Sequence, residues 1–223
     1  MTMKEPAPVL WIEARVPVIL AILAVLFLLT ILPRPLAMLP VWIPWVAMIV
    51  VIVPMVAVGL TAAKARWLRI ERIVTLLFFV FVGVGIAVNL ASLIREMVHR
   101  SAGIDGLQLL SSSIAVWVAN VLGFSLLYWE MDRGGPEARA NKAGKKPDWL
   151  FPQEGVLAED VPAGWRPTFV DYLFLGFTTS TAFSPTDTLP LTSRAKILMM
   201  LQCTISLVTI VAVASRAINI LGN

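Results

Sequence analysis

The chain has 223 residues, of which 58% are hydrophobic and only 14% are charged. Soluble domains are about 45–50% apolar and about 25% charged, so this composition indicates an integral membrane protein. One cysteine, Cys203, excludes an internal disulfide, and one histidine, His99, adds too little for a transition-metal cluster. The net charge of +4 is attributed to basic residues that anchor membrane spans, and no nucleic-acid partner is expected.

Five apolar stretches have about the length, 17–25 residues, that a membrane-spanning helix needs. Pro33 and Pro35 are expected to end the first of them, and Pro54 is expected to kink the second. Tyr128 and Trp129 end the fourth with an aromatic pair that suits a membrane interface. The fold class is therefore all-α, with spans over residues 16–32, 41–60, 73–94, 107–129 and 195–221.

Few polar side chains interrupt these spans. The side-chain amides within the spans are expected to form interhelical hydrogen bonds.

The absence of ionisable residues at the centres of spans two to four argues against a proton-coupled pump. The basic residues between spans two and three are interpreted as a connecting loop. The amides are Asn89, Asn120, Gln202 and Asn219, and the basic residues are Lys64, Arg66, Arg69 and Arg72.

The only long hydrophilic stretch, residues 130–168, separates spans four and five. It contains Gly134-Gly135-Pro136 and a mixture of basic and acidic side chains. Glycine, proline and mixed charges are typical of a loop. We therefore predict a solvated loop on one side of the membrane with little core of its own.

A short apolar segment follows this loop. Thr168 and Asp171 form a variant of the capping box, which predicts a helix beginning at Phe169. The apolar run ends at Phe177 or slightly later, so the helix has about 10–14 residues and is typical of a re-entrant segment. The alternative is a helix lying on the membrane surface, but its apolar character all round favours burial. The negative pole of its dipole would point at Thr181 and favour a cation there.

Residues 178–187 read Thr-Thr-Ser-Thr-Ala-Phe-Ser-Pro-Thr-Asp, and this segment after the helix resembles the pore hairpin of the tetrameric potassium-channel superfamily. Residues 178–187 align without a gap with the potassium pattern T-T-x-T-T-V-G-Y-G-D, and Pro190 and Thr192 fall on the Pro-x-Thr that precedes the inner helix. The resemblance covers about residues 107–223 and implies a pore helix, a filter-like loop and an inner helix in each of four subunits. The whole chain is also similar to a bacterial family of five-span membrane proteins, through Gly134-Gly135, Phe151-Pro152 and Thr192-Ser193-Arg194.

The filter positions depart from the potassium pattern. Ser184 and Thr186 replace its two glycines, and Pro185 replaces its aromatic residue. Because a Cβ resists positive φ, an unbroken ladder of inward carbonyls is not expected. Threonine and serine hydroxyls are expected to line a wider, hydrated passage instead. The expected ion-pathway residues are Thr178, Thr179, Thr181, Ala182, Phe183, Ser184, Pro185, Thr186 and Asp187.

Several of these positions have a plainer interpretation. Asp187 is either a cation-attracting residue at the pore mouth or a turn residue that bonds backbone amides. Phe183 either faces the pore or packs behind it. Thr192 or Ser193 is expected to be the N-cap of the last helix.

The chain is expected to divide into a three-span region, 1–106, and a channel-like region, 107–223. The second region comprises the fourth span, loop 130–168, the short helix with its filter-like loop 169–187, and span 195–221. Fourteen of the 18 Lys and Arg residues lie on the side of the N-terminus and the long loop, which predicts that this side is cytoplasmic. Potassium channels have the opposite orientation.

The expected function is that of an ion-channel-like protein that passes monovalent cations with weak selectivity through the axis of a homo-oligomer, a tetramer by resemblance. K⁺ or Na⁺ is the only expected ligand; no cofactor, metal site or catalytic residue is expected. The alternative is a non-conducting membrane scaffold that keeps the hairpin as a packing unit. An enzyme is not expected, because no nucleophile–base pair lies within the spans. The lipid bilayer is the expected partner, and the expected location is the bacterial plasma (inner) membrane.

Overall fold

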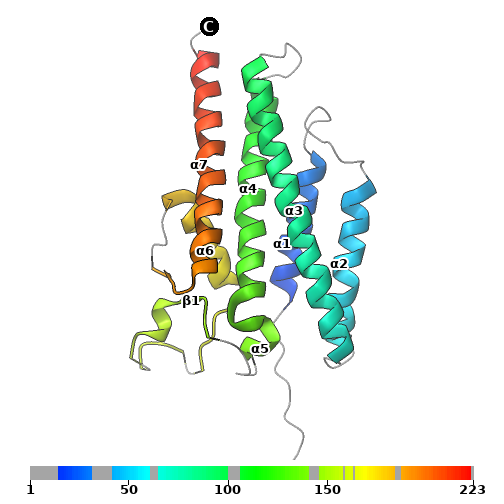
Figure 1. Cartoon of the computed structure of the whole chain (residues 1–223), viewed down its shortest axis with the longest axis vertical. Coiled ribbons are helices and arrows are strands. Elements are labelled where there is room, and N and C mark those ends of the chain that lie inside the picture. Colours follow the sequence, from blue (N-terminus) through cyan, green and yellow to red (C-terminus); the bar gives the residue numbers. More distant parts are fainter. Residues whose placement is uncertain are drawn as a thin grey trace, which may run out of the picture.

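The computed structural model describes residues 15–31, 42–60, 65–99, 106–140, 146–157, 159–162, 164–183 and 187–221. The described chain is predominantly helical, so the all-α class is confirmed (Figure 1). The elements are α1 (Val16–Ile31), α2 (Trp42–Leu60), α3 (Ala65–His99), α4 (Gly106–Met131), η1 (Asp132–Gly134), α5 (Pro136–Ala140), β1 (Trp149–Leu150), η2 (Pro152–Glu154), α6 (Phe169–Ala182), β2 (Leu189–Pro190) and α7 (Ser193–Leu221).

Among the described residues, three helices are long and apolar enough to cross a membrane. Their apolar stretches are Ile70–Ser92 in α3, Leu110–Gly134 in α4 and the following η1, and Ser193–Ala214 in α7. The described parts of α1 and α2 carry shorter apolar stretches, Val16–Leu28 and Trp45–Val58. The composition and these three helices together indicate a membrane protein.

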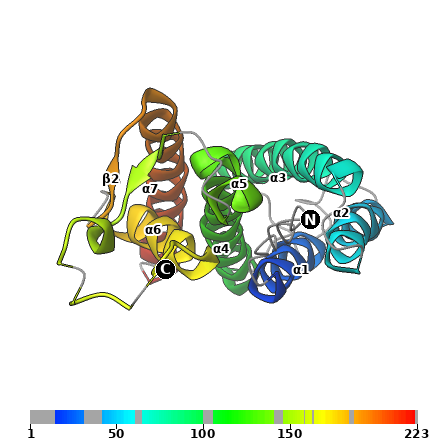
Figure 2. The ribbon, with the colours of Figure 1, turned by 90° about the horizontal axis from the view of Figure 1, so that it is seen from below.

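α4 lies at the centre of the bundle. It packs against α1 and α3 on one side and against α6 and α7 on the other, while α2 packs on the outside of α1 and α3 (Figure 2). The long helices alternate in direction along the chain. The start of α1, the end of α4, the small element α5 and the start of α7 therefore lie at one end of the bundle, which we call the loop end (Figure 1).

One prediction about a helix end is wrong. α3 begins at Ala65, so Arg66, Arg69 and Arg72 lie on its first two turns and not in a connecting loop. Tyr128 and Trp129 at the end of α4 are buried in protein, with 0% and 2% of their surface exposed, and their place at a membrane interface stays a prediction. The ring of Tyr128 packs on that of Trp149, with 4.7 Å between centroids. Burial of this pair anchors the long loop to the end of α4.

The long hydrophilic stretch also has more structure than predicted. Its two-residue strand β1 pairs antiparallel with β2, and Trp149 lies opposite Pro190. Trp149 and Phe151 are 0% and 3% exposed, and both belong to the main hydrophobic core. The prediction of a solvated loop without a core is therefore wrong for this part of the stretch, although Glu159 and Asp160 are exposed as expected.

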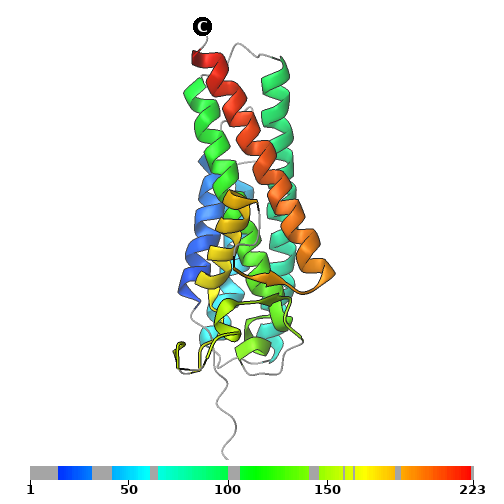
Figure 3. The same cartoon turned by 90° about the vertical axis from the view of Figure 1, so that its left-hand side faces the viewer.

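α6 and β2 form a hairpin that stays at one end of the bundle. α6 starts at the loop end and runs upward beside α7, and it stops well short of the far end of that helix (Figure 3). β2 lies back at the loop end, immediately before α7 begins (Figure 3). The helix has 14 residues, which confirms the predicted start and length.

Candidate functional site

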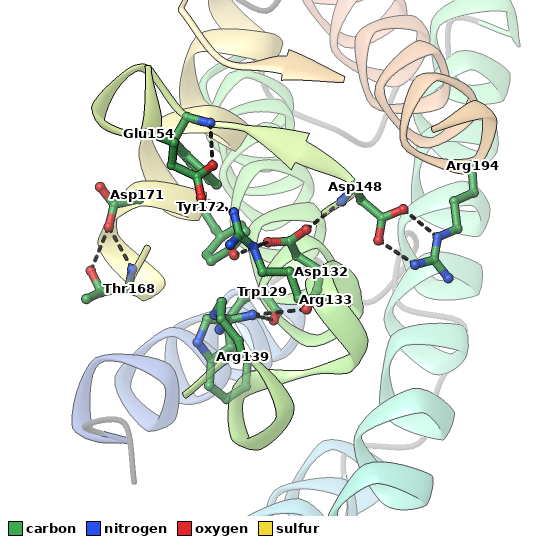
Figure 4. A network of polar contacts seen from close by, with 11 residues as sticks. Trp129, Asp132, Arg133, Arg139, Asp148, Glu154, Thr168, Asp171, Tyr172 and Arg194 are labelled. Atoms are coloured by element: carbon green, nitrogen blue, oxygen red, sulfur yellow. Dashed lines mark hydrogen bonds and ion pairs between the residues drawn. The ribbon is translucent and has the colours of Figure 1, made fainter. Parts of the chain in front are cut away.

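α6 begins with a formed capping box. The backbone N–H of Thr168 donates to Oδ2 of Asp171 at 2.7 Å, and the Thr168 hydroxyl donates to the same oxygen at 2.9 Å (Figure 4). Such contacts hold together the first turn of a helix. The capping box predicted from the sequence is therefore confirmed.

α6 has one buried face and one exposed face. Both sets of side chains recur at spacings of three and four residues, as expected for a helix that packs on one side only. The buried residues are Phe169, Tyr172, Leu175, Gly176, Thr179 and Ser180. The exposed residues of the opposite face are Val170, Phe174, Phe177 and Thr181. A single chain thus leaves a mostly apolar stripe of α6 uncovered.

Gly176 lets α6 approach α4 closely. A Cβ at this position would lie 2.2 Å from Oγ of Ser125 and 3.2 Å from the carbonyl oxygen of Val121. The Ser125 hydroxyl already donates to that carbonyl at 2.7 Å. Any side chain at position 176 would therefore push the two helices apart.

Gln202 of α7 joins three helices. Its Nε2 donates to the carbonyl oxygen of Gly176 and to Oγ of Ser180, both at 2.8 Å. Its Oε1 accepts from the Tyr128 hydroxyl at 2.5 Å. Since a backbone carbonyl only accepts, the amide nitrogen must face Gly176, and the orientation of the Gln202 side chain is fixed. The predicted interhelical role of Gln202 is confirmed.

Asn120 of α4 makes a second contact with α7. Its Nδ2 donates to Oγ of Ser206 at 3.1 Å and to the carbonyl oxygen of Gln202 at 3.3 Å. The interhelical role predicted for Asn120 is thereby confirmed, whereas the side chains of Asn89 and Asn219 lie outside the described part of the structure. We call the buried set formed by Asn120, Tyr128, Ser180, Gln202 and Ser206 the mid-bundle network.

The C-terminal end of α6 lies level with the middle of its neighbours. The carbonyl oxygen of Thr179 accepts from Sγ of Cys203 at 3.5 Å, and Cys203 lies near the middle of the apolar stretch Ser193–Ala214. On α4, the ring of Trp117 meets that of Phe177 edge-on, with 6.0 Å between centroids. The polar end of this short helix is therefore level with the most apolar part of the bundle.

Two of the predicted ion-pathway hydroxyls bond to their own helix. The Thr178 hydroxyl donates to the carbonyl oxygens of Phe174 and Leu175, at 2.9 Å and 3.1 Å. The Thr181 hydroxyl donates to that of Phe177 at 2.8 Å. Both side chains thus turn back along α6, and their oxygen lone pairs remain available to a ligand.

The other predicted positions differ among themselves. Thr179 is fully buried, whereas Ala182 and Asp187 are exposed. Phe183 caps the helix in the left-handed conformation, with φ of 56°, and 43% of its surface is exposed. This conformation is uncommon for a residue with a Cβ. The remaining positions lie outside the described residues; they are Ser184, Pro185 and Thr186.

Asp148, in the long loop, holds the start of α7. Its carboxylate is fully buried and accepts from the Thr192 hydroxyl and from Nε of Arg194, both at 2.6 Å, and a second nitrogen of Arg194 completes a two-pronged ion pair. Oγ1 of Thr192 also accepts from the backbone N–H of Ala195 at 3.3 Å. Thr192 therefore caps α7, as predicted.

Asp132, at the end of α4, connects the loop to α6. Its Oδ1 accepts from the backbone N–H of Asp148 at 2.7 Å, and its Oδ2 accepts from the Tyr172 hydroxyl at 2.6 Å (Figure 4). The guanidinium of Arg139 lies over the Tyr172 ring, 4.9 Å from its centroid. We call Asp132, Asp148, Tyr172 and Arg194 the loop clamp.

Sequence reasoning missed the loop clamp, because it assigned these charges to a solvated surface. The available signal was the glycine pair directly after α4. Gly134 and Gly135 have φ of 86° and 106°, and Arg133 before them has φ of 56°. Glycine adopts positive φ without steric cost, so two in succession indicate a sharp turn. This turn directly follows Asp132, whose carboxylate bonds to Tyr172 of α6.

A second ionic group fixes the start of α1 at the same end. Nε of Arg15 donates to Glu71 of α3 at 2.9 Å, and Arg15 also pairs with Glu137 of α5. Burial by itself lowers the pKa of Arg15, but the hydrogen bonds and charges of Glu71 and Glu137 outweigh it and hold this pKa above its ordinary value. The side chain is therefore charged at every physiological pH.

Comparison of the chain with protein-family models, with curated proteins and with solved structures finds no match in any of the three. Functional inference therefore rests on the geometry of α6 and on the sequence resemblance of residues 178–192.

Proposed function

We propose that the chain is an ion-channel-like protein of the bacterial plasma membrane. In this proposal α1, α2, α3, α4 and α7 cross the bilayer, and α6 enters from the loop end and stops midway. Copies of the chain assemble around an axis lined by α7 and by the end of α6, and monovalent cations pass along this axis. The charge count puts the loop end in the cytoplasm.

The observation that carries this proposal is the exposed polar end of α6, level with the middle of α4 and α7. A helix leaves its last four carbonyl groups without partners inside the helix. Thr181, Ala182 and Phe183, at this end, are all exposed in a single chain. Unpaired backbone groups are very unfavourable in hydrocarbon, so such an end requires water or more protein around it. An oligomer with a hydrated axis provides both.

The chemistry of this end favours cations. The C-terminal pole of a helix carries a partial negative charge, and several such poles around one axis attract cations and repel anions. Thr178 and Thr181 offer neutral hydroxyl oxygens to a partly hydrated ion. Because Ser184 and Thr186 replace the glycines of the potassium pattern, K⁺ and Na⁺ are expected to pass with weak discrimination. The resemblance to potassium channels favours a tetramer.

A non-conducting scaffold is the second candidate, and the mid-bundle network favours it. Gln202 fixes α6 to α4 and α7 through buried hydrogen bonds, as expected of a packing unit. In this alternative the exposed aromatic side chain of Phe183 fills the axis instead of lining it.

Reconstitution tests the channel proposal directly. Purified protein is examined for oligomeric state by light scattering and for current in planar bilayers under a KCl gradient. We expect a tetramer and a reversal potential that favours cations over anions. A monomer with silent bilayers would leave only the scaffold, and anion-selective current would overturn the proposed chemistry.

Thiol labelling tests whether the end of α6 reaches water. In a Cys203→Ala background, Thr181→Cys is treated with a charged, membrane-impermeant thiol reagent during recording. We expect the current to fall. Val80→Cys is the matched control, because Val80 is 65% exposed on the outside of α3 and is expected to face lipid. Equal insensitivity of both variants would remove Thr181 from the ion path.

A further inference from the structure

Unpartnered buried polar atoms concentrate at one level of the bundle. Among the described residues, four buried side-chain atoms have no hydrogen-bond partner, and three of them lie on α4 and α6 near the mid-bundle network. These three are Trp117 Nε1, Asn120 Oδ1 and Thr179 Oγ1. Most buried polar atoms in proteins have a partner, which is either protein or ordered water. Three exceptions on two adjoining helices therefore call for a shared explanation.

The carbonyl oxygen of the Asn120 side chain cannot be satisfied by flipping the amide. Its Nδ2 faces the backbone carbonyl of Gln202 at 3.3 Å, and that carbonyl only accepts. A flipped amide would set two acceptors against each other. Oδ1 of Asn120 must therefore point away from α7, and the residue is 0% exposed.

Thr179 departs from the pattern of the other threonines of α6. The hydroxyls of Thr178 and Thr181 both donate to carbonyls of their own helix, but that of Thr179 makes no such bond. The residue is 0% exposed, and an unbonded hydroxyl in an apolar surrounding is unfavourable. The Thr179 hydroxyl therefore does not bond to its own helix, unlike the hydroxyls of Thr178 and Thr181.

Contacts on two sides put these atoms at the same level. The backbone carbonyl of Thr179 accepts from Cys203 Sγ, and Nδ2 of Asn120 donates to Ser206 Oγ, so both residues contact the segment Gln202–Ser206 of α7. α4 and α6 run in opposite directions, so Trp129 meets Phe169 at one end and Trp117 meets Phe177 near the other. Asn120 and Thr179 consequently face the same junction of three helices.

We propose that this junction of α4, α6 and α7 is an internal water site, in which one or two water molecules bridge Asn120 Oδ1 and Thr179 Oγ1 and accept from Trp117 Nε1. An amide oxygen accepts, an indole N–H donates, and a hydroxyl does both. Water matches this mixture, because it donates two hydrogen bonds and accepts two. A cation is repelled by the indole N–H, and no ion pair of the described residues involves this network. The site does not depend on whether the protein conducts ions.

Hydroxyl-radical labelling detects such a site, because bound water is converted to radicals where it lies. Trp117 is expected to be oxidised well above the level of Trp149 in intact protein. Trp149 gives the background of a fully buried indole, since it is 0% exposed and its Nε1 already donates to Met199 Sδ at 3.4 Å. Because Trp117 itself is partly exposed, the change in its labelling on substitution of Thr179 carries the test. Thr179→Val is expected to lower the labelling of Trp117, and Thr179→Ser to preserve it.

Stability measurements provide the second readout. With water bound, Thr179→Val breaks a satisfied network and lowers the unfolding temperature in detergent. Without water, the same change removes an unsatisfied hydroxyl and raises that temperature. Thr209→Val is the control, because the Thr209 hydroxyl is 1% exposed and bonds only to Ile205 of its own helix among the described residues. A stabilised Thr179→Val variant, or equal labelling of Trp117 and Trp149, would overturn the proposal.

Discussion

The mid-bundle network and the loop clamp both contain fully buried polar side chains, but they differ chemically. Gln202, Asn120, Asp132 and Asp148 are all 0% exposed. The mid-bundle network consists entirely of neutral amides and hydroxyls, whereas the loop clamp is built on two carboxylates and an arginine. The two sets hold the two ends of the same short helix, α6.

Depth in the bundle accounts for this difference. A charge far from water costs much more than a neutral amide, because its hydration is lost and seldom fully replaced. At the loop end, Arg194 keeps 48% of its side chain exposed, so its charge stays partly hydrated. Gln202, by contrast, is 0% exposed, and its hydrogen-bond partners are all neutral groups. Each set therefore uses the strongest hydrogen-bonding groups that its depth permits.

Arg194→Ala should disrupt the loop clamp and cause the largest loss of stability. It leaves the buried carboxylate of Asp148 without its cation, and removing one partner of a buried ion pair costs about 3–5 kcal/mol. Thermal unfolding in detergent, followed by tryptophan fluorescence, measures the loss. The control is Asp148→Asn, which should cost less, since Arg194 can reach water. Equal losses in both variants would contradict the asymmetry.

Gln202→Glu should destabilise the mid-bundle network by introducing a charge. A carboxylate at the centre of a membrane helix costs about 2.5–3.5 kcal/mol, and this one would also face the carbonyl of Gly176 without a donor. Gln202→Leu, which loses the bonds but adds no charge, should be destabilised by only about 1–2 kcal/mol. The same unfolding assay compares them. A Glu variant as stable as the Leu variant would contradict the comparison, because the carboxyl would then be either protonated or hydrated at this depth.

Gly176→Ala should destabilise the protein by separating α6 from α4, without altering any charge. Its Cβ would lie 2.2 Å from Ser125 Oγ, and overpacking of this kind costs about 1–3 kcal/mol. Ser125→Ala in the same chain removes the tightest contact and should restore part of the stability. If the double variant is no more stable than Gly176→Ala alone, Ser125 is not the obstacle.

The sequence predicted the local features of the fold well. The start of α6, its capping box and the cap of α7 at Thr192 all follow from residues within four positions of each other. The interhelical roles of Asn120 and Gln202 were also predicted, because an amide inside an apolar helix needs a partner. The ion pathway stays a prediction, since Ser184, Pro185 and Thr186 lie outside the described residues.

The loop clamp could not be predicted in the same way. Asp132 and Asp148 are separated by 16 residues, and Tyr172 lies 40 residues beyond Asp132. Apart from the glycine pair after Asp132, which indicates only a turn, nothing near these residues in sequence distinguishes them from solvated charges. Their burial depends on the turn after α4 and on the pairing of β1 with β2, which places the loop beneath α6 and α7.

By itself, the sequence determined that the chain is helical and apolar and where α6 begins, because hydrophobic runs and helix caps act over a few residues. Only the tertiary structure decided which polar groups meet. Gln202 reaches Tyr128 across 74 positions and Ser180 across 22, and Gly176 permits the close approach. Partners so distant along the chain are selected by how helices pack, which no local pattern encodes.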